Sequence, residues 1–213
     1  ALMGHLSSEK FLAALSISSS VLIMIIGSLG FLRMATVGVV SQALGKGDYK
    51  EVARTIIRNL LLALILSIVV ILCKPLILSN INIFFSPSLE TSILIEKYVS
   101  IRIFSIPAEL IIYVIIGFFL GIQKTFFSSS VVIFFCIMNI FLSIFFVNNM
   151  NLEIYGVALG TVVSSYLTAF ISMFVCFFYF KHRFNQIPRF EKIFIRKKII
   201  KIFNINFDIF LRS

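Results

Sequence analysis

The 213-residue sequence is poor in charged residues, which make up 13% of the chain, and it contains no tryptophan. A soluble domain carries about 25% charged and about 45–50% apolar residues, whereas apolar residues make up 60% of this chain and its mean hydropathy is +1.07. The chain therefore has too few polar residues for a soluble fold and too many apolar residues for a disordered one. The composition indicates an integral membrane protein.

Residue types that carry catalysis or bind metals are scarce. The two histidines, His5 and His182, lie outside the apolar runs, and the three cysteines stand singly inside them without CxxC spacing. We interpret the cysteines as small buried apolar residues. The sequence contains no GxSxG, HExxH or Walker A motif and no paired carboxylates. No catalytic residue and no metal ligand is therefore predicted, and the sequence argues against an enzyme.

Long apolar runs make up most of the chain. A bilayer core about 30 Å thick needs about 20 apolar residues per helix. We expect five spans, which run from 11 into the 30s and over 56–78, 93–120, 126–147 and 155–180. Gly27 and Gly30 permit a bend in the first span, Lys74-Pro75 closes the second, and Pro107 should kink the third. Small residues between 156 and 165 permit close approach of another helix. The fold class is all-α, a polytopic transmembrane bundle.

The net charge of +10 is concentrated in a few connections. Segments 45–58 and 181–205 are rich in Lys and Arg, the turn at Lys124 holds one cation, and segments 79–92 and 148–153 hold none. This alternation predicts five consecutive spans with the basic connections in the cytoplasm. We expect 1–180 to form the bundle, 181–205 a basic cytoplasmic linker and 206–213 the start of a further helix. The cations indicate topology and contact with membrane lipids, not nucleic acid.

Ionisable side chains inside a span are costly and indicate function. Arg33 lies near the inner end of the first span and Arg102 in the outer part of the third, and either could extend to the interface. Glu109 lies two residues after Pro107, about midway along its span. It is the only carboxylate clearly at bilayer depth, so it is the strongest candidate for a functional residue.

Helical periodicity places four polar residues on one face of the third span, namely Arg102, Ser105, Glu109 and Tyr113. This face should point into the protein or into a water-filled cavity. Glu109 is then either a buried carboxylate satisfied by Ser105, an arginine or a neighbouring helix, or a proton or cation site that lines a cavity. Asn139 is a second polar residue within a span, and it is either a helix-packing contact or a cavity ligand.

Six segments resemble the multidrug and toxic compound extrusion (MATE) transporters, in their DinF-like branch. They are GHLSS at 4–8, GFLRMATVGVVSQALGKGD at 30–48, IRIFSIPAELIIYVIIGFFLGIQKT at 101–125, MNIFLSIFFV at 138–147, GVALGTVVSSY at 156–166 and FNINFDIFLRS at 203–213. Members of this family have two six-helix lobes around a central cavity. The resemblance implies that this chain is the N-terminal lobe, that it begins within or just after the first helix, and that 181–205 links the lobes. It also implies a multi-pass protein of the bacterial inner membrane.

The resemblance also implies a set of site residues. Positions that line the N-lobe cavity in this branch fall at Tyr113, Asn139 and Thr161. The family's fifth-helix aspartate falls at Ser143, whose hydroxyl can hydrogen-bond but cannot carry a proton at accessible pH. The first-helix aspartate would lie before the first residue of this sequence. Glu109, one turn from Tyr113, is a candidate substitute. No organic cofactor is implied, and the coupling ion would be H⁺ or Na⁺.

Three functions are consistent with the resemblance. The first is efflux of small cationic or amphipathic molecules in exchange for H⁺ or Na⁺ by alternating access, with a separate C-terminal lobe as a partner. The second is a non-transporting remnant or a half-transporter subunit, because the family's two aspartates are missing. The third is a lipid-linked oligosaccharide flippase of the same superfamily, which would need several cations to bind pyrophosphate. Near membrane depth the sequence offers only Arg33 and Arg102.

Overall fold

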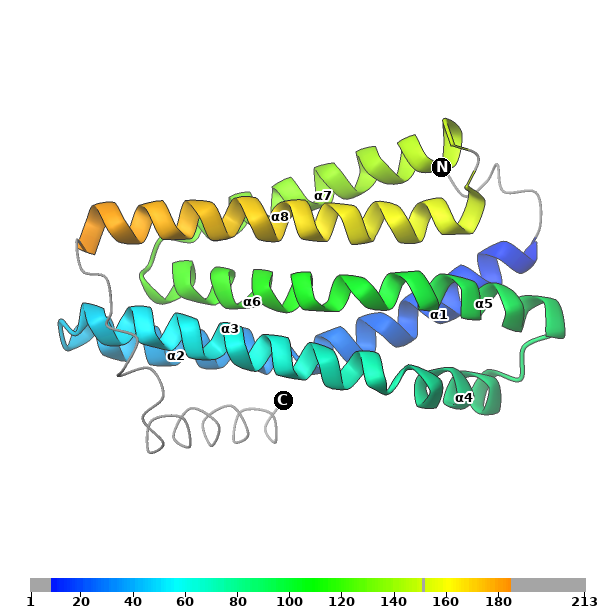
Figure 1. Ribbon diagram of the computed structural model, residues 1–213, viewed down its shortest axis with the longest axis horizontal. Helices are drawn as coiled ribbons and strands as arrows, with labels where there is room; N and C mark the ends of the chain where they lie inside the picture. Colours follow the sequence, from blue (N-terminus) through cyan, green and yellow to red (C-terminus); the bar gives the residue numbers. More distant parts are fainter. Residues whose placement is uncertain (1–8, 151, 185–213) are drawn as a thin grey trace.

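The computed structural model describes residues 9–150 and 152–184, and this part of the chain is a bundle of α-helices (Figure 1). The elements are α1 (Glu9–Ser28), α2 (Phe31–Gly45), α3 (Tyr49–Leu72), α4 (Lys74–Phe85), α5 (Leu89–Arg102), the 3₁₀ turn η2 (Ile103–Ser105), α6 (Ile106–Gly121), α7 (Thr125–Asn148) and α8 (Glu153–Phe184). Five stretches of the described residues are long and apolar enough to cross a membrane. The all-α fold class is confirmed. Helix α8 continues four residues past the expected boundary at 180, and the rest of the expected linker and the start of the next helix lie outside the described residues.

Two of the five spans are broken helices, as the sequence predicts. In the first span, residues 29 and 30 separate α1 from α2, and the Gly30 amide donates to the Gly27 carbonyl oxygen at 2.9 Å. In the third span, η2 separates α5 from α6, and Pro107 stands in the first turn of α6. Proline fits there because the first-turn N–H groups have no intrahelical acceptor. The helices are thus interrupted at both places where the sequence predicts a bend or a kink.

The second span differs from the expectation at both ends. Helix α3 begins at Tyr49, after Asp48, whose carboxylate accepts a hydrogen bond from the Glu51 amide at 3.0 Å. It ends at Leu72, and Pro75 lies in the first turn of the separate helix α4. The expected limits of 56 and 78 are therefore wrong, and part of the expected connection after 78 is helical. Proline is favourable at the start of a helix although it is disruptive inside one.

The described connections alternate between the two ends of the bundle. Figure 1 places the α2–α3 and α6–α7 connections and the end of α8 at one end, opposite the starts of α1 and α8. This is the end where the sequence predicts basic connections. Two of its cations, Arg54 and Arg58, pair with Glu51 at 3.5 and 2.9 Å, and the Arg58 side chain is only 4% exposed. These two arginines therefore also form ion pairs with a carboxylate in the first turn of α3.

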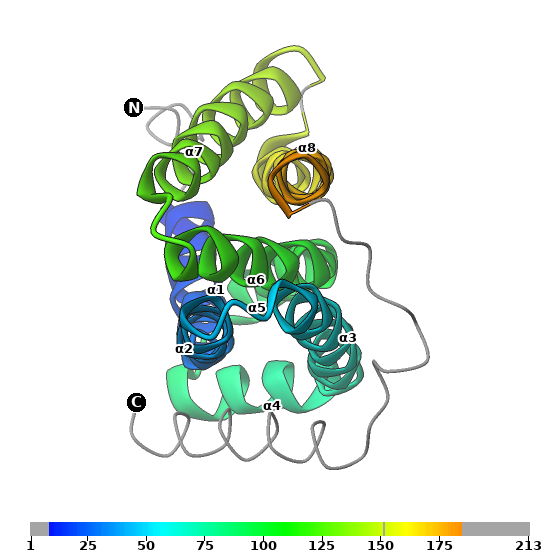
Figure 2. The same cartoon turned by 90° about the vertical axis from the view of Figure 1, so that its left-hand side faces the viewer.

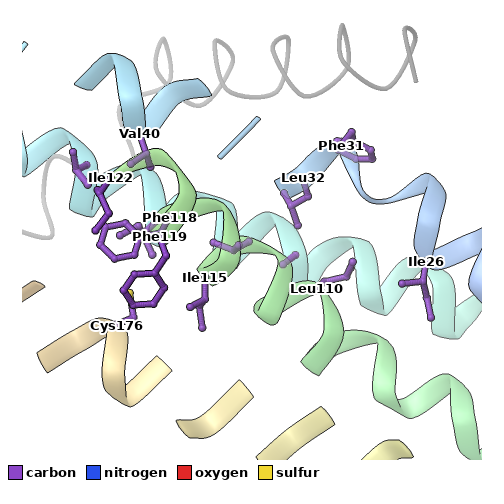
Figure 3. Packing of buried hydrophobic residues seen from close by; sticks show 14 of the residues in the cluster. Ile26, Phe31, Leu32, Val40, Leu110, Ile115, Phe118, Phe119, Ile122 and Cys176 are labelled. Atoms are coloured by element: carbon purple, nitrogen blue, oxygen red, sulfur yellow. The ribbon is translucent and has the colours of Figure 1, made fainter. Parts of the chain in front are cut away.

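Helix α6 is the central helix of the bundle. Figure 2 shows it between α7 and α8 on one side and α2 and α3 on the other. Figure 3 shows its buried side chains packing against α2 and α8, with Phe118 and Phe119 beside Cys176. A Cβ on Gly117 would lie 2.8 Å from both the Arg33 carbonyl oxygen and the Thr36 Cβ. The α2 and α6 backbones therefore meet closely through a small residue, as is typical of membrane helices.

Gly117→Ala is expected to lower the stability of the bundle by about 1–3 kcal/mol, because the added methyl group must push α2 away from α6. Gly38→Ala in α2 is the matched control, since a Cβ there meets nothing within 4 Å. Both changes raise helix propensity equally, so their melting temperatures in detergent isolate the packing effect. Equal melting temperatures would contradict the close approach.

The cysteines are only partly as expected. All three are free, and Cys176 is buried, Cys73 is half-buried and Cys136 is exposed. The expectation of burial is wrong for Cys136, because α7 turns much of its apolar surface outward. The exposed residues of α7 include Ile133, Ile137, Ile140 and Phe141. In a membrane this surface would contact lipid or another membrane segment.

Candidate functional site

A pocket of about 410 Å³ lies between α1, α5, α6, α7 and α8. Its polar lining includes five residues that the sequence analysis selected, namely Arg102, Glu109, Tyr113, Asn139 and Thr161. Helices α5 and α6 contribute the first three from the face predicted by periodicity, while α7 and α8 contribute the other two. The fold thus brings together side chains from three separate spans.

An ion pair forms the centre of this lining. Arg102 Nη1 lies 2.7 Å from Glu109 Oε1, and the two side chains are 11% and 12% exposed. Arg102 is the last residue of α5 and Glu109 lies in the first turn of α6, so the pair bridges η2. Arg102 also donates to the Ser105 hydroxyl, which donates to the Arg102 carbonyl oxygen at 2.7 Å. The pair therefore holds the two parts of the broken helix together.

Helix α8 supplies hydroxyl groups to the same site. Ser165 Oγ lies 3.5 Å from Glu109 Oε1 and 2.7 Å from the Thr161 carbonyl oxygen, so its proton can go to either acceptor. Asn139 Nδ2 donates to Ser164 Oγ at 3.3 Å. The sequence had marked this part of α8 only as small enough for helix packing. The Glu109 carboxylate is thus satisfied by an arginine and a neighbouring helix and also lines a pocket, while its role as a proton or cation site stays a prediction.

Two of the selected residues are not part of the pocket lining. The Arg33 guanidinium carbon is 5.7 Å from the centre of the Tyr113 ring, within cation–π range. Ser143 packs at the contact between α7 and α8, where a Cβ on Gly160 would lie 2.5 Å from Ser143 Oγ. Arg33 can thus affect the pocket through Tyr113, whereas the described contacts of Ser143 are with α8.

Other residues that line the pocket were not selected from the sequence, among them Ser19, Tyr98 and Phe135. Ser19 Oγ donates to the Tyr98 hydroxyl at 3.4 Å, which joins α1 to α5. The run SISSS at 16–20 was an available signal, because serine is uncommon on a lipid-facing surface. Phe135 had no such signal, since it stands among other apolar residues of α7.

The pocket suits a small amphipathic molecule. Its volume lies within the range of about 300–1,000 Å³ that small-molecule sites occupy. Three aromatic rings, those of Tyr98, Tyr113 and Phe135, line it together with apolar residues of α1. Aromatic faces attract organic cations, and Glu109 supplies one carboxylate that can be ionised or protonated.

Broken membrane helices that line an ionisable pocket are typical of secondary transporters. The MatE family model matches residues 1–145, and the chain belongs to the MatE family. It is 31% identical over 176 residues to the DNA damage-inducible protein F of Escherichia coli K12, a match that covers 81% of this chain and 38% of that protein. The MATE resemblance and its DinF-like branch are confirmed.

Solved structures show the same fold. A multidrug resistance MATE family transporter of the MOP superfamily in an outward-facing conformation matches with a TM-score of 0.83 and 18% identity, over 96% of this chain and 45% of that chain. An inward-facing conformation of a multidrug resistance MATE family transporter of the MOP superfamily matches with a TM-score of 0.77 and 19% identity. This match covers 95% of this chain and 46% of that chain. The chain thus spans less than half the length of these relatives. The fold is that of one lobe of a MATE transporter.

Proposed function

We propose that this chain forms one lobe of a secondary efflux transporter of the bacterial inner membrane, which exports cationic or amphipathic molecules in exchange for H⁺ or Na⁺. Family membership supports membrane transport. The observation that carries the proposal is the Glu109 carboxylate, which forms an ion pair with Arg102 and lies in a pocket lined by several spans. An ionisable residue inside the membrane is costly, and it is typical of ion and substrate pathways.

In this proposal Glu109 binds the coupling ion, while Tyr113, Asn139 and Thr161 contact the substrate. The breaks between α1 and α2 and between α5 and α6 are where the spans can bend during alternating access. A second lobe would complete the cavity. A binding role for Ser143 stays a prediction that rests on the resemblance alone.

Ethidium efflux from drug-sensitive bacteria tests the proposal. Cells that express the chain, alone and together with a candidate C-terminal lobe, are loaded with ethidium, and the rate of efflux is compared with that of vector-only cells. We expect efflux above the vector control that stops when the ion gradient is dissipated. A protonophore in Na⁺-free buffer and removal of Na⁺ at constant pH distinguish the two coupling ions. No efflux in either arrangement, with the protein verified in the membrane, would refute the proposal.

One observation favours the alternative of a non-transporting remnant or assembly subunit. Ser143 occupies the position at which the resemblance implies an aspartate, and its hydroxyl cannot carry a proton. The flippase alternative is weaker, because it needs several cations available for pyrophosphate. Arg102 is already paired with Glu109 at 2.7 Å.

A further inference from the structure

We propose that a second pocket, formed by α6, α7 and α8, binds a small neutral aromatic molecule that carries one hydrogen-bonding group. We call it the aromatic pocket, after the phenylalanines Phe119, Phe126, Phe127 and Phe134 in its lining. The described residues that line it include none of those that line the pocket of Glu109. The inference goes beyond the proposed efflux function and does not depend on it.

The ends of α6 and α7 position two of these rings. Phe119 lies near the end of α6, and Phe127 lies in the first turn of α7, at the end of the bundle with the α6–α7 connection (Figure 1). The Lys124 amide donates to the Phe119 carbonyl oxygen at 2.8 Å, which closes this connection. The rings of Phe119 and Phe127 are stacked, with centroids 5.1 Å apart and planes at 19°. The aromatic pocket therefore has a packed aromatic wall.

The shape and size of the aromatic pocket favour a small flat ligand. Phe126 meets Phe127 edge to face, with centroids 6.0 Å apart and planes at 80°. The wall thus offers both ring faces and ring edges, and aromatic molecules pack favourably against either. The volume of about 320 Å³ lies at the lower end of the range for small-molecule sites. A compact fused-ring molecule fits this space better than a large drug.

The lining indicates a neutral ligand. The described residues of the aromatic pocket include no charged side chain. An ion that enters an apolar site without a partner of opposite charge loses its hydration and gains little in return. This distinguishes the aromatic pocket from the pocket of Glu109, where an ion pair belongs to the lining.

A buried hydroxyl without a partner indicates the polar group of the ligand. Thr168 of the lining is 1% exposed, and its Oγ1 has no hydrogen-bond partner within the described part of the chain. The other two hydroxyls of the lining are used, because Ser130 donates to the Phe126 carbonyl oxygen at 2.8 Å and Ser172 to that of Ala169 at 3.1 Å.

A ligand can supply the partner that Thr168 lacks. A buried polar group without a hydrogen bond is costly, so a bond made to it on binding is a gain. A hydroxyl both donates and accepts, so a phenol or a carbonyl group on the ligand would serve. Thr168 is therefore assigned as the residue that selects a ligand with one polar group over a purely apolar one.

Two matched probes test this assignment. 2-Naphthol and naphthalene have the same fused rings, but only the first carries a hydroxyl. We would measure their dissociation constants from probe fluorescence for the full chain in detergent micelles, with empty micelles subtracted. The chain contains no tryptophan, so indole emission does not interfere. The variants are Thr168→Val and Phe134→Leu. Thr55→Val is the matched control.

The control matches Thr168 closely. Thr55 is 0% exposed, and its Oγ1 also lacks a partner among the described residues, but it lies on α3, outside the described lining of the aromatic pocket. Both Thr→Val changes thus remove an unpaired buried hydroxyl and keep the branched shape. Neither should lower the melting temperature of the ligand-free chain.

The two probes should respond differently to the variants. Thr168→Val should weaken binding of 2-naphthol by roughly twofold to tenfold, the effect of one hydrogen bond, and leave naphthalene unchanged. Thr55→Val should change neither dissociation constant. Phe134→Leu should weaken both probes by a similar factor, because it removes a ring that both contact.

Three results would overturn the proposal. The first is no saturable binding of 2-naphthol above the empty micelles, which would mean that only water or detergent fills the aromatic pocket. The second is unchanged binding of 2-naphthol by Thr168→Val. The third is an equal loss for both probes in that variant, which would indicate a distorted pocket. If Thr168→Val does not fold, Thr168→Ala serves instead, and its loss should still be larger for 2-naphthol than for naphthalene.

Discussion

Glu109→Gln is expected to reduce energised ethidium efflux to the level of vector-only cells. The amide matches the carboxylate in size, but it can neither bind and release a proton nor bind a cation by charge. If Glu109 is the coupling residue, the variant loses its response to the ion gradient at every external pH. Efflux rates at several external pH values, at equal protein levels in the membrane, measure this.

Two companion variants make the result specific. Glu90→Gln removes the same charge from a side chain at the start of α5 that pairs with Lys10 and is 67% exposed, so efflux should be unchanged. Glu109→Asp keeps the carboxylate but shortens its reach to Arg102, so partial activity is expected. Unchanged efflux by Glu109→Gln in an active assembly would show that another group couples the ion.

Much of this site was accessible from the sequence because helical periodicity is a local property. The spacing of Arg102, Glu109 and Tyr113 places them on one face of a helix, and the structure has them lining one pocket. The partners of that face were not accessible in this way. Ser165 reaches Glu109 from 56 residues away along the chain, and periodicity gives no information about which helix lies opposite. Only the packing of α8 against α6 decides that contact.

The errors have physical causes as well. Pro75 was taken as the end of a span because proline breaks a helix interior, but the same residue starts α4, where its fixed backbone angle is favourable. Cys136 was taken as buried because cysteine is usually an interior residue in soluble proteins. In a membrane bundle, however, the outer surface is also apolar, so hydrophobicity alone does not separate buried from exposed positions.

Arg102→Met is expected to cost about 3–5 kcal/mol of stability, because it leaves the Glu109 carboxylate without its partner at a site where both side chains are nearly nine-tenths buried. The double variant Arg102→Met with Glu109→Leu should recover most of this loss, since apolar side chains avoid the cost of burying charge. Unfolding of the chain in mixed micelles measures both. Lys10→Met, which breaks an exposed pair with Glu90, should cost about 0–1 kcal/mol.

The comparison between the single and double variants separates stability from function. A small loss in Arg102→Met, equal to that in Lys10→Met, would mean that water reaches the ion pair and screens it, which contradicts a desolvated pair. If the double variant is as stable as the wild type, the ion pair adds no net stability to the bundle. The presence of a buried ion pair that adds no net stability is not explained by a contribution to folding. Its place across the break between α5 and α6, facing a pocket, is then better explained by the binding and release of positive charge.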